Sequence, residues 1–421
     1  MSFLPQLIQS NLKDSAACSP SVCSAHPDVL AASCLLAKDY DRDLIIEATS
    51  NQVNQFGGYT GMLPADFIAS VQKIAESVGY PTERIVFGGD HLGPQVWRKE
   101  PADIAMQNAK DMMAAYVKAG FTKIHLDCSE GCAGEPAQVS DAVSAERATA
   151  LAVVCAEHAP DPAALSFVVG TEVPPPGGAR PEDEHDGVQP TTAQAAITTL
   201  DVHKAAFEAA SDAALWERVI ALVVQPGVEF APDDIDHLPM GSPDLLSEIL
   251  PDYPGICFEA HSTDYQYPAV FSELGRRHFA ILKVGPALTY AYREAIYALS
   301  NFDQWLNNST PISELMEAKM QSNPKYWQGH YQAEDDLKLR DLLHFSYADR
   351  IRYYWTEPDV MAAVDALQDR LQAVKPDHFL LRAFVPAATL ERAYVLEKQG
   401  IAWHKAVIYT YIQEALAPYW Q

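Results

Sequence analysis

The segment Ile85-Val-Phe-Gly-Gly-Asp-His91 runs from an apolar start into a carboxylate and an imidazole. A short apolar run that ends in polar residues is typical of a buried parallel strand. Seven further segments of the first 290 residues repeat this pattern, at 21–26, 44–50, 123–127, 166–172, 219–225, 255–261 and 279–285. Eight such units, with helical patterns between them, predict an α/β fold of the closed (β/α)8 TIM-barrel type. In that fold the reactive groups lie at the C-terminal ends of the strands.

The helices expected between these strands are marked by proline and glycine. Residues 27–38 and 64–78 have proline near the first turn, and residues 102–119 stop at Gly120, just before the next strand. A long loop rich in proline, glycine and acidic residues, 174–187, follows the fifth expected strand. Its length and composition indicate a mobile lid or rim loop.

The C-terminal part of the chain has a different pattern. The 421 residues exceed the roughly 250 that are typical of one barrel. From about residue 300 the strand signal disappears, and amphipathic helical segments follow at 311–321, 333–344 and 358–373. The sequence therefore predicts a barrel over 1–300 and a helical C-terminal extension, packed on the barrel, over 301–421.

The charge and composition restrict the class of protein. The formal net charge of -26, from 56 acidic and 30 basic residues, argues against DNA or RNA as a partner. No apolar run is long enough to span a membrane, and the N-terminus lacks a secretion signal. The seven cysteines are scattered and odd in number, which favours reduced thiols. We therefore expect a cytoplasmic protein with no nucleic-acid or membrane partner.

Potential metal ligands stand at several of the expected strand ends. His91, Glu172 and His261 end the third, fifth and seventh strands, and Asp90 precedes His91. Nitrogen and oxygen ligands that converge from different strands suit a metal that polarises a sugar carbonyl. Asp90 could then act beside the metal as acid or base, and Asp127 on the fourth strand could bind a cation or hold a ligand by a hydrogen bond.

Each of these residues also has a structural interpretation. A single histidine at a strand end is more often hydrogen-bonded within the fold than a ligand, and we rank His26, His125 and His203 low on that ground. Glu172 or Asp127 alone could cap a helix or pair with a cation. The set as a whole favours a metal site.

Glycine-rich segments give little support to nucleotide binding. Gly57-Gly58-Tyr59-Thr60-Gly61 could cradle an anion with its amides, although such turns often serve only the backbone. The phosphate-binding loops of nucleoside triphosphatases and of dinucleotide-binding folds have no counterpart in the sequence. A kinase is therefore the least favoured reading.

Long motifs stand at 46–61, 88–94, 123–127, 170–174, 224–230, 259–266, 282–288 and Asp349-Arg-Ile-Arg-Tyr-Tyr-Trp355. They resemble those of the D-tagatose-1,6-bisphosphate aldolase subunit family, GatZ/KbaZ. The resemblance runs from about Ser21 to Trp355.

This family is in turn similar to the zinc-dependent class II aldolases. Asp90-His91 and His261 match the aldolase pattern, whereas Glu172 replaces the histidine of the fifth strand. Ser262-Thr-Asp-Tyr-Gln266 stands where those aldolases have a glycine-rich phosphate loop, and Gly285 stands where they have asparagine. The resemblance implies a divalent metal, Zn²⁺ or Mn²⁺, held by His91, Glu172, His261 and Asp127.

The resemblance implies two activities. The first is 4-epimerisation of D-tagatose 6-phosphate to D-fructose 6-phosphate, with Asp90 and Glu172 as catalytic residues. The second is a non-catalytic subunit that supports a separate class II aldolase. We favour the epimerase, because a supporting subunit has little need of the strand-end constellation, and we expect a homo-oligomer. The expected substrate contacts are Glu47, Asn51, Gly57, Gly58, Gln225, Ser262, Asp264, Lys283, Gly285 and Arg293.

Overall fold

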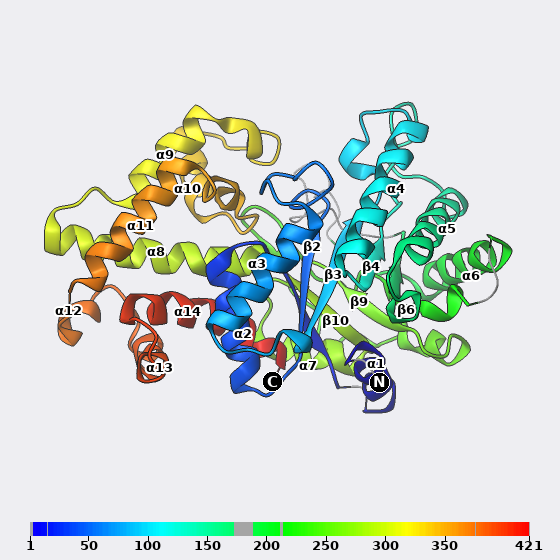
Figure 1. The fold of residues 1–421 in the computed structure, drawn as a ribbon, viewed down its shortest axis with the longest axis horizontal. Coiled ribbons are helices and arrows are strands. Elements are labelled where there is room, and N and C mark those ends of the chain that lie inside the picture. Colours follow the sequence, from blue (N-terminus) through cyan, green and yellow to red (C-terminus); the bar gives the residue numbers. More distant parts are fainter. Residues whose placement is uncertain (1–2, 15, 172–187, 211–213, 375, 421) are drawn as a thin grey trace.

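Eight parallel strands form a closed barrel in the computed structural model, which describes residues 3–14, 16–171, 188–210, 214–374 and 376–420 (Figure 1). The order around the barrel is β1-β10-β9-β6-β5-β4-β3-β2. The bounds are β1 (Ser19–Cys23), β2 (Leu44–Thr49), β3 (Ile85–Leu92), β4 (Lys123–Leu126), β5 (Ser166–Val169), β6 (Val219–Val223), β9 (Cys257–Ala260) and β10 (Phe279–Val284). Each coincides with an expected strand, so the predicted TIM-barrel fold is confirmed.

Helices cover the outside of the barrel. Their bounds are α2 (Pro27–Asp39), α3 (Pro64–Ser77), α4 (Ala102–Ala119), α5 (Asp141–His158), α6 (Ala193–Ala210), α7 (Pro268–Arg276) and α8 (Pro286–Asn307). Two begin at the expected prolines, and α4 ends where Gly120 adopts a φ of 113° that other residues rarely take. Between β6 and β9 the chain departs from the pattern. It forms a short antiparallel pair, β7 (Glu229–Phe230) with β8 (Ile235–Asp236), and the 3-10 turn η5 (Ser247–Asp252).

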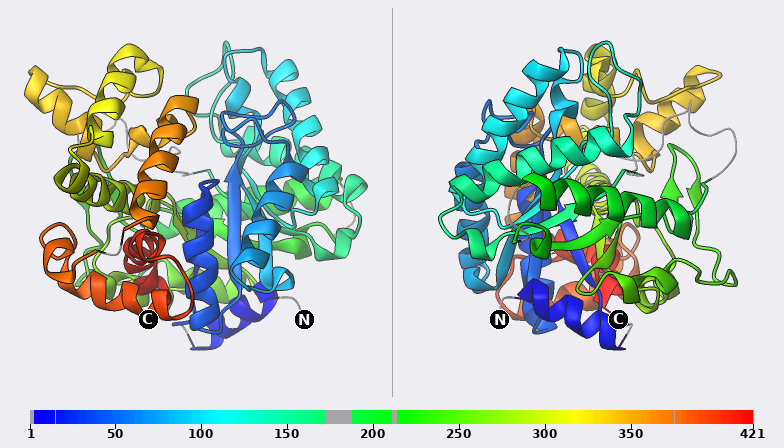
Figure 2. Two further views of the ribbon diagram at one scale, coloured as in Figure 1. Left: turned by 60° about the vertical axis from the view of Figure 1, so that its left-hand side comes forward. Right: turned by 90° about the vertical axis from the view of Figure 1, so that its right-hand side faces the viewer.

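The N-terminal end of the barrel is closed by the first helix, α1 (Phe3–Asp14), which lies below the strands in Figures 1 and 2. Asn11 fixes it there, because its Nδ2 donates to the carbonyls of Ala17 (2.7 Å) and Gly275 (3.1 Å). We call the apolar side chains of α1 and of the lower barrel interior the N-terminal plug. Its members include Leu4, Leu7, Ile8, Ile45, Val168, Ile220, Cys257, Ala280 and Ile281.

The described residues of the C-terminal extension form helices joined by loops (Figure 1). Its elements are α9 (Ile312–Ser322), α10 (Asp336–Phe345), η7 (Arg350–Tyr354), α11 (Pro358–Gln372), α12 (His378–Leu381), α13 (Ala387–Lys398), α14 (Trp403–Leu416) and η8 (Ala417–Trp420), with one further 3-10 turn at 324–326. The three helical segments expected from the sequence correspond to α9, α10 and α11. The expected division at residue 300 falls inside α8, which runs from the barrel into the extension.

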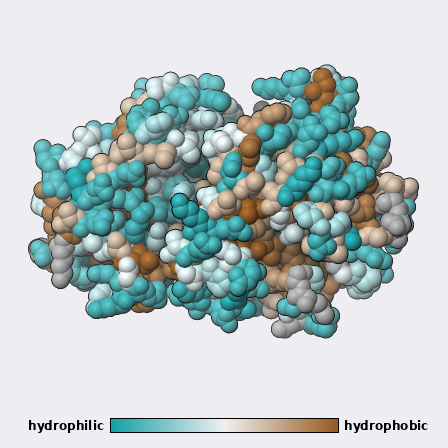
Figure 3. All heavy atoms as spheres, in the orientation of Figure 1, coloured by the Kyte–Doolittle hydropathy of each residue, from teal (hydrophilic) through white to brown (hydrophobic). Residues whose placement is uncertain are grey.

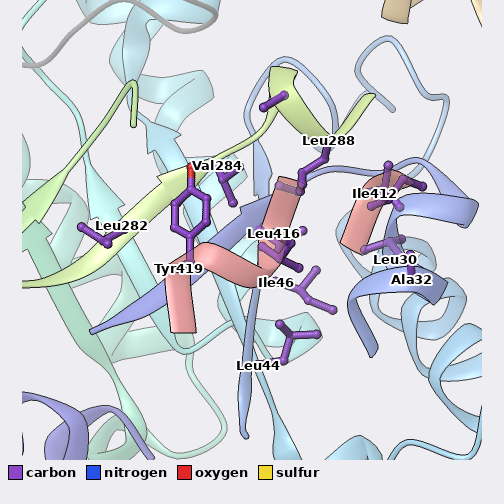
Figure 4. Close-up of a cluster of buried hydrophobic side chains, with 14 of the residues drawn as sticks. Leu30, Ala32, Leu44, Ile46, Leu282, Val284, Leu288, Ile412, Leu416 and Tyr419 are labelled. Atoms are coloured by element: carbon purple, nitrogen blue, oxygen red, sulfur yellow. The ribbon is translucent and has the colours of Figure 1, made fainter. Parts of the chain in front are cut away.

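The last helix returns to the barrel. Lys405 of α14 pairs with Asp28 of α2 at 2.7 Å, and the hydroxyl of Tyr419 donates to the carbonyl of Thr263 at 3.0 Å. Figure 4 shows Leu416 and Tyr419 among buried side chains of α2, β2, β10 and α8. Because α14 packs against both α2 and α8, the end of the chain is part of the layer that surrounds the barrel.

The face of the molecule in Figure 3 is mostly hydrophilic, with small and separate apolar patches. All seven cysteines are free, as the sequence predicts. No helix in the described part of the chain has both the length and the apolar composition needed to cross a membrane.

Candidate metal centre

The end of β3 carries the first two residues of the centre, Asp90 and His91. Gly88, two residues before Asp90, leaves room for the side chain of Glu47, because a Cβ atom there would lie 2.5 Å from Oε1 of Glu47. His91 has a φ of 45°, a left-handed conformation that is uncommon for residues other than glycine. The hydroxyl of Ser50 donates to the carbonyl of His91 at 2.9 Å and helps to hold this backbone. Strain of this kind concentrates at functional sites.

Four buried side chains meet at the C-terminal end of the barrel. Asp90, His91, His125 and His261 each offer a ligand atom, and these atoms all lie within 4.8 Å of one another. The three imidazole centroids are 4.9 to 5.2 Å apart. Three imidazoles and a carboxylate are a set that Zn²⁺, Mn²⁺ and related divalent ions accept.

The hydrogen bonds around the imidazoles fit a metal ion. Nδ1 of His91 lies 2.8 Å from Oδ2 of Asp127, and Nε2 of His261 lies 3.0 Å from Oε1 of Glu259. Such outer carboxylates orient metal-binding histidines. In the described part of the chain, Nε2 of His125 and Nδ1 of His261 are buried without a hydrogen-bond partner. Buried polar nitrogens normally have partners, so these two favour an ion among the imidazoles.

The metal ligands predicted from the sequence take different positions in the structure. His91 and His261 belong to the group of converging ligand atoms, whereas Asp127 contacts His91 from behind. Glu172, expected as a ligand and as a catalytic residue, lies outside the described residues and stays a prediction. His125, which the sequence analysis ranked low, lies in the group.

Strand alternation is the signal that could have found His125. Lys123, His125 and Asp127 stand two residues apart, and alternate side chains of a strand point to the same face. All three are buried inside the barrel. A strand with three such residues on its inner face indicates a polar barrel interior rather than isolated structural residues.

Below the histidines lies a network of buried charges. The ammonium of Lys123 contacts Glu47 at 2.6 Å and Glu259 at 2.7 Å, and all three side chains are fully buried. The ammonium of Lys283 contacts Asp90 at 2.7 Å and also pairs with Glu47. Buried charges need such partners because a lone ion is poorly solvated in the interior. The network links the floor of the barrel to the metal ligands.

The electrostatic environment shifts the pKa values of the candidate ligands in different directions. Burial raises the pKa of Asp90, but the surrounding imidazoles of His91, His125 and His261 outweigh it and hold the pKa well below its usual range. Burial opposes protonation of His91, but Asp90 and Asp127 raise its pKa to about 9. Burial lowers the pKa of His261 to about 4, so this imidazole is neutral, the form that binds a metal.

A cavity of about 1200 Å³ opens above the four ligands. Asp90, His91 and His261 line it, together with several of the expected substrate contacts. Those contacts are Asn51, Ser262, Asp264, Lys283 and Gly285.

Glu47, Gly57 and Gly58 do not line the cavity. Glu47 lies in the charged network beneath the cavity. It pairs with Lys283, which lines the cavity. The amide of Gly57 donates to the carbonyl of Asn54, and the amide of Gly58 donates to the side-chain oxygen of Asn54. Gly58 has a φ of 56°, and a Cβ there would lie 2.4 Å from the carbonyl oxygen of Gln52. The two glycines therefore serve the turn, and their amides are already bonded within it.

Gln225 and Arg293 also lie away from the cavity. The side-chain oxygen of Gln225 accepts from the amides of Gly227 (2.8 Å) and Val228 (2.9 Å) and so shapes the loop after β6. Arg293 on α8 is 1% exposed, lies 3.6 Å from Asp349 and is enclosed by aromatic rings. Both have the packing roles that are the ordinary alternative to substrate binding.

Asp264 caps the first turn of α8. Its Oδ1 accepts from the amides of Gly285 at 3.0 Å and Ala287 at 2.8 Å. Burial raises the pKa of Asp264 to about 6, although these amides oppose the rise. A carboxylate therefore occupies the helix N-terminus where barrel enzymes frequently bind phosphate.

Sequence reasoning assigned no role to the residues that the extension contributes to the cavity. Arg350, Arg352 and Tyr353 of η7 line it together with residues of the barrel loops. Their segment was recognised only as a family motif. Its approach to the strand ends depends on the path of the extension, which has no signal in local sequence patterns.

Comparisons with known proteins agree with this architecture. The family model described as D-tagatose-1,6-bisphosphate aldolase subunit GatZ/KbaZ-like matches residues 4–421. The D-tagatose 6-phosphate 4-epimerase of Agrobacterium fabrum (strain C58) is 48% identical over 371 residues, which are 87% of this chain and 86% of the relative. The D-tagatose-1,6-bisphosphate aldolase subunit GatZ of Klebsiella pneumoniae subsp. pneumoniae is 45% identical over 404 residues, 95% of this chain and 94% of the relative.

A solved structure supports the whole-chain fold. The crystal structure of a probable tagatose 6 phosphate kinase from Sinorhizobium meliloti 1021 superposes with a TM-score of 0.85 and 42% identity. The match covers 95% of this chain and 98% of that one. The chain therefore belongs to the GatZ/KbaZ-like family of D-tagatose-1,6-bisphosphate aldolase subunits.

Proposed function

We propose that this protein is a metal-dependent 4-epimerase that interconverts D-tagatose 6-phosphate and D-fructose 6-phosphate. The observation that carries the proposal is the buried group Asp90, His91, His125 and His261, of which Asp90, His91 and His261 line the cavity. Two of its imidazole nitrogens have no partner among the described residues. The relative from Agrobacterium fabrum bears the name of this activity.

The chemistry follows from the position of the centre that is inverted. The C4 hydrogen of a ketose is not acidic, so direct proton abstraction cannot invert C4. A divalent ion among the imidazoles would polarise the C2 carbonyl and the C3 hydroxyl. Asp90, which its surroundings keep ionised, would accept the proton of the C4 hydroxyl.

Loss of that proton allows a retro-aldol cleavage. The C4 oxygen becomes an aldehyde oxygen, the C3–C4 bond breaks, and its electron pair passes into the C2 carbonyl to give an enediolate. Rotation of the aldehyde about C4–C5, attack by C3 on its other face and return of the proton from Asp90 complete the inversion. No atom or electron is gained or lost, provided that both fragments stay in the cavity.

Turnover by the isolated chain tests the proposal. The purified protein, stripped with a chelator and resupplied with Zn²⁺ or Mn²⁺, should convert D-tagatose 6-phosphate to D-fructose 6-phosphate without a partner. Substrate deuterated at C4 should keep its label, because retro-aldol cleavage leaves the C4–H bond intact. Loss of the label to solvent would contradict the mechanism, and no turnover with any divalent metal would contradict the function.

Asp90→Asn tests the proposed base while the three imidazoles remain to hold the ion. Measured at saturating metal, it should lower kcat by at least about 100-fold, the range of general acid-base catalysis. Asp103→Asn, an exposed change in the first turn of α4, is the matched control and should be fully active. A fully active Asp90→Asn variant would remove Asp90 from the mechanism.

The alternative is a supporting subunit that does no chemistry itself. It is favoured by the 45% identity to a chain named as an aldolase subunit. If it is correct, the isolated chain should be inactive, and D-tagatose 1,6-bisphosphate cleavage by a separate class II aldolase polypeptide should rise when this chain is added.

A further inference from the structure

The cavity has two walls of different origin. The barrel supplies three of the candidate ligands, Asp90, His91 and His261, and η7 of the extension supplies Arg350, Arg352 and Tyr353. The ring of Tyr59, from the loop after β2, meets Tyr353 edge to face with centroids 4.9 Å apart. The charged end of η7 therefore faces the same space as the metal ligands.

The cations around the cavity differ in their partners. Lys283 pairs with Asp90 at 2.7 Å, and Lys405 pairs with Asp28 at the same distance. Arg98, at the rim, likewise pairs with Glu130, and Lys99 is exposed there.

Arg350 and Arg352 have no carboxylate within ion-pair distance among the residues that the structure describes. Arg350 is 7% exposed and donates its Nε to the carbonyl of Tyr326 at 2.6 Å. No hydrogen bond of its two Nη atoms to a described residue is found. Arg352 donates to the carbonyls of Ala348 and Asp349 and to the hydroxyl of Tyr353. These partners are neutral, so no described residue compensates the two charges by direct contact.

One buried and one half-buried guanidinium group, with no acid in contact among the described residues, create a site that favours an anion. Burial raises the pKa of Tyr353, but Arg350 and Arg352 outweigh it and the pKa falls below its ordinary value. A phosphate would accept hydrogen bonds from the guanidinium groups in the geometry that arginine provides best. Asp349, the acid next in sequence, lies 2.6 Å from the hydroxyl of Thr289 and faces Arg293.

The usual phosphate position of a barrel is closed in this chain. The carboxylate of Asp264 already accepts the amides of Gly285 and Ala287 at the start of α8. A phosphate at that position would have to take the place of the Asp264 carboxylate, which is itself an anion. Asp264 also attracts Arg352 electrostatically, but the two side chains make no ion pair within 4 Å in the described chain.

We propose that Arg350 and Arg352 form the phosphate subsite for the ketose phosphate, so that the extension and not the barrel recognises the phosphate. The inference rests on the proposed function and deepens it. In D-tagatose 6-phosphate the phosphate belongs to the C4–C6 fragment that retro-aldol cleavage releases as an aldehyde. Anchored at C6, that fragment stays in the cavity while rotation about C4–C5 presents its other face to C3.

Substrates with and without phosphate test the subsite. Arg350→Met and Arg352→Met should each raise KM for D-tagatose 6-phosphate by about 10- to 100-fold, the effect of one charged hydrogen-bond partner. Any turnover of free D-tagatose should stay within twofold of the wild type. Arg392→Met, an exposed arginine of the extension, is the matched control and should change neither value.

Binding of inorganic phosphate gives a readout that does not depend on turnover. Calorimetry on the metal-loaded protein should show weaker phosphate binding in both methionine variants and partial recovery in Arg350→Lys and Arg352→Lys. If the wild type is inactive, the proposed function fails, while the loss of phosphate binding still supports the subsite. If a methionine variant does not fold, the lysine variant is compared with the wild type in its place.

One competing position would overturn the subsite. If phosphate binds at the start of α8, Asp264→Asn should strengthen phosphate binding about tenfold, and the arginine variants should leave it unchanged. Under our proposal the arginine variants lose binding, and Asp264→Asn changes it by less than about threefold. Unchanged KM and unchanged phosphate affinity in both arginine variants contradict the proposal.

Discussion

The two ends of the barrel interior are filled by opposite kinds of side chain. At the N-terminal end, Leu7 and Ile8 of α1 pack on apolar strand residues in the plug. Towards the C-terminal end, Lys123, Glu47 and Glu259 form a buried network below the histidines that leads to the metal ligands. Apolar packing stabilises without demanding a particular partner, whereas each buried charge depends on its neighbours. One end therefore supplies stability and the other supplies a defined chemical environment.

The largest effect should come from breaking the charged end. Lys123→Met leaves Glu47 and Glu259 buried without their shared cation, which should lower the free energy of unfolding by about 3–5 kcal/mol. Urea unfolding monitored by circular dichroism measures it. Adding Glu259→Gln should restore part of the loss, because one uncompensated charge is removed. A loss below about 1 kcal/mol would mean that the network does not depend on Lys123.

A smaller loss is expected at the apolar end. Leu7→Ala in the plug should lower the free energy of unfolding by about 2–3 kcal/mol through lost burial and a residual cavity. Metal affinity should be unchanged, because the ligands are held by the opposite ends of the strands. Leu337→Ala, at an exposed position of α10, is the control with no expected loss. Altered metal affinity in Leu7→Ala would show that the two ends are coupled.

Asp127→Asn sharpens the comparison within the charged end. It keeps the size of the side chain but weakens the 2.8 Å contact that orients His91. We expect metal affinity to fall by about 10- to 100-fold, as for other outer carboxylates of metal sites, with little change in the unfolding midpoint. Competition with a chromogenic chelator measures the affinity. Wild-type affinity would show that His91 is oriented by its backbone alone.

The smallest effect should come from an ion pair on the surface. Lys319 and Asp359 of the extension are 2.8 Å apart, a distance similar to that of the Lys123 pairs. Their charges remain in solvent, so Lys319→Met should leave the urea midpoint in place. The same substitution at residues 123 and 319 therefore compares a buried ion pair with an exposed one of similar geometry. Equal losses at the two positions would contradict the role given to burial.

The fold was predictable because its signal is local and repeated. Each strand is an apolar run that ends in polar residues, and prolines start α2 and α3 where expected. The short antiparallel pair after β6 and the helix α1 were not predicted. The first consists of two-residue strands, which carry no periodicity, and the second is defined by packing under the barrel.

The site was predictable only in part. Asp90, His91 and His261 could be found because they end strands, and parallel strand ends meet in a barrel. His125 was ranked low because it was considered alone and not with the residues two positions away. Arg350 and Arg352 lie far along the chain from the strands they face. Only the three-dimensional path of the extension brings them to the cavity.

The return of α14 to the barrel bears on how the protein is made. The helix and Tyr419 complete the packing over the first and last strands, yet they are synthesised after every strand that they cover. While these residues are still in the ribosomal exit tunnel, the seam between β1 and β10 lacks its cover. Apolar side chains of that seam are then open to other chains, a state that favours aggregation. Emergence of α14 and Tyr419 from the ribosome is therefore the step that lets the barrel become whole, and a truncation before α14 would act on folding before it acted on catalysis.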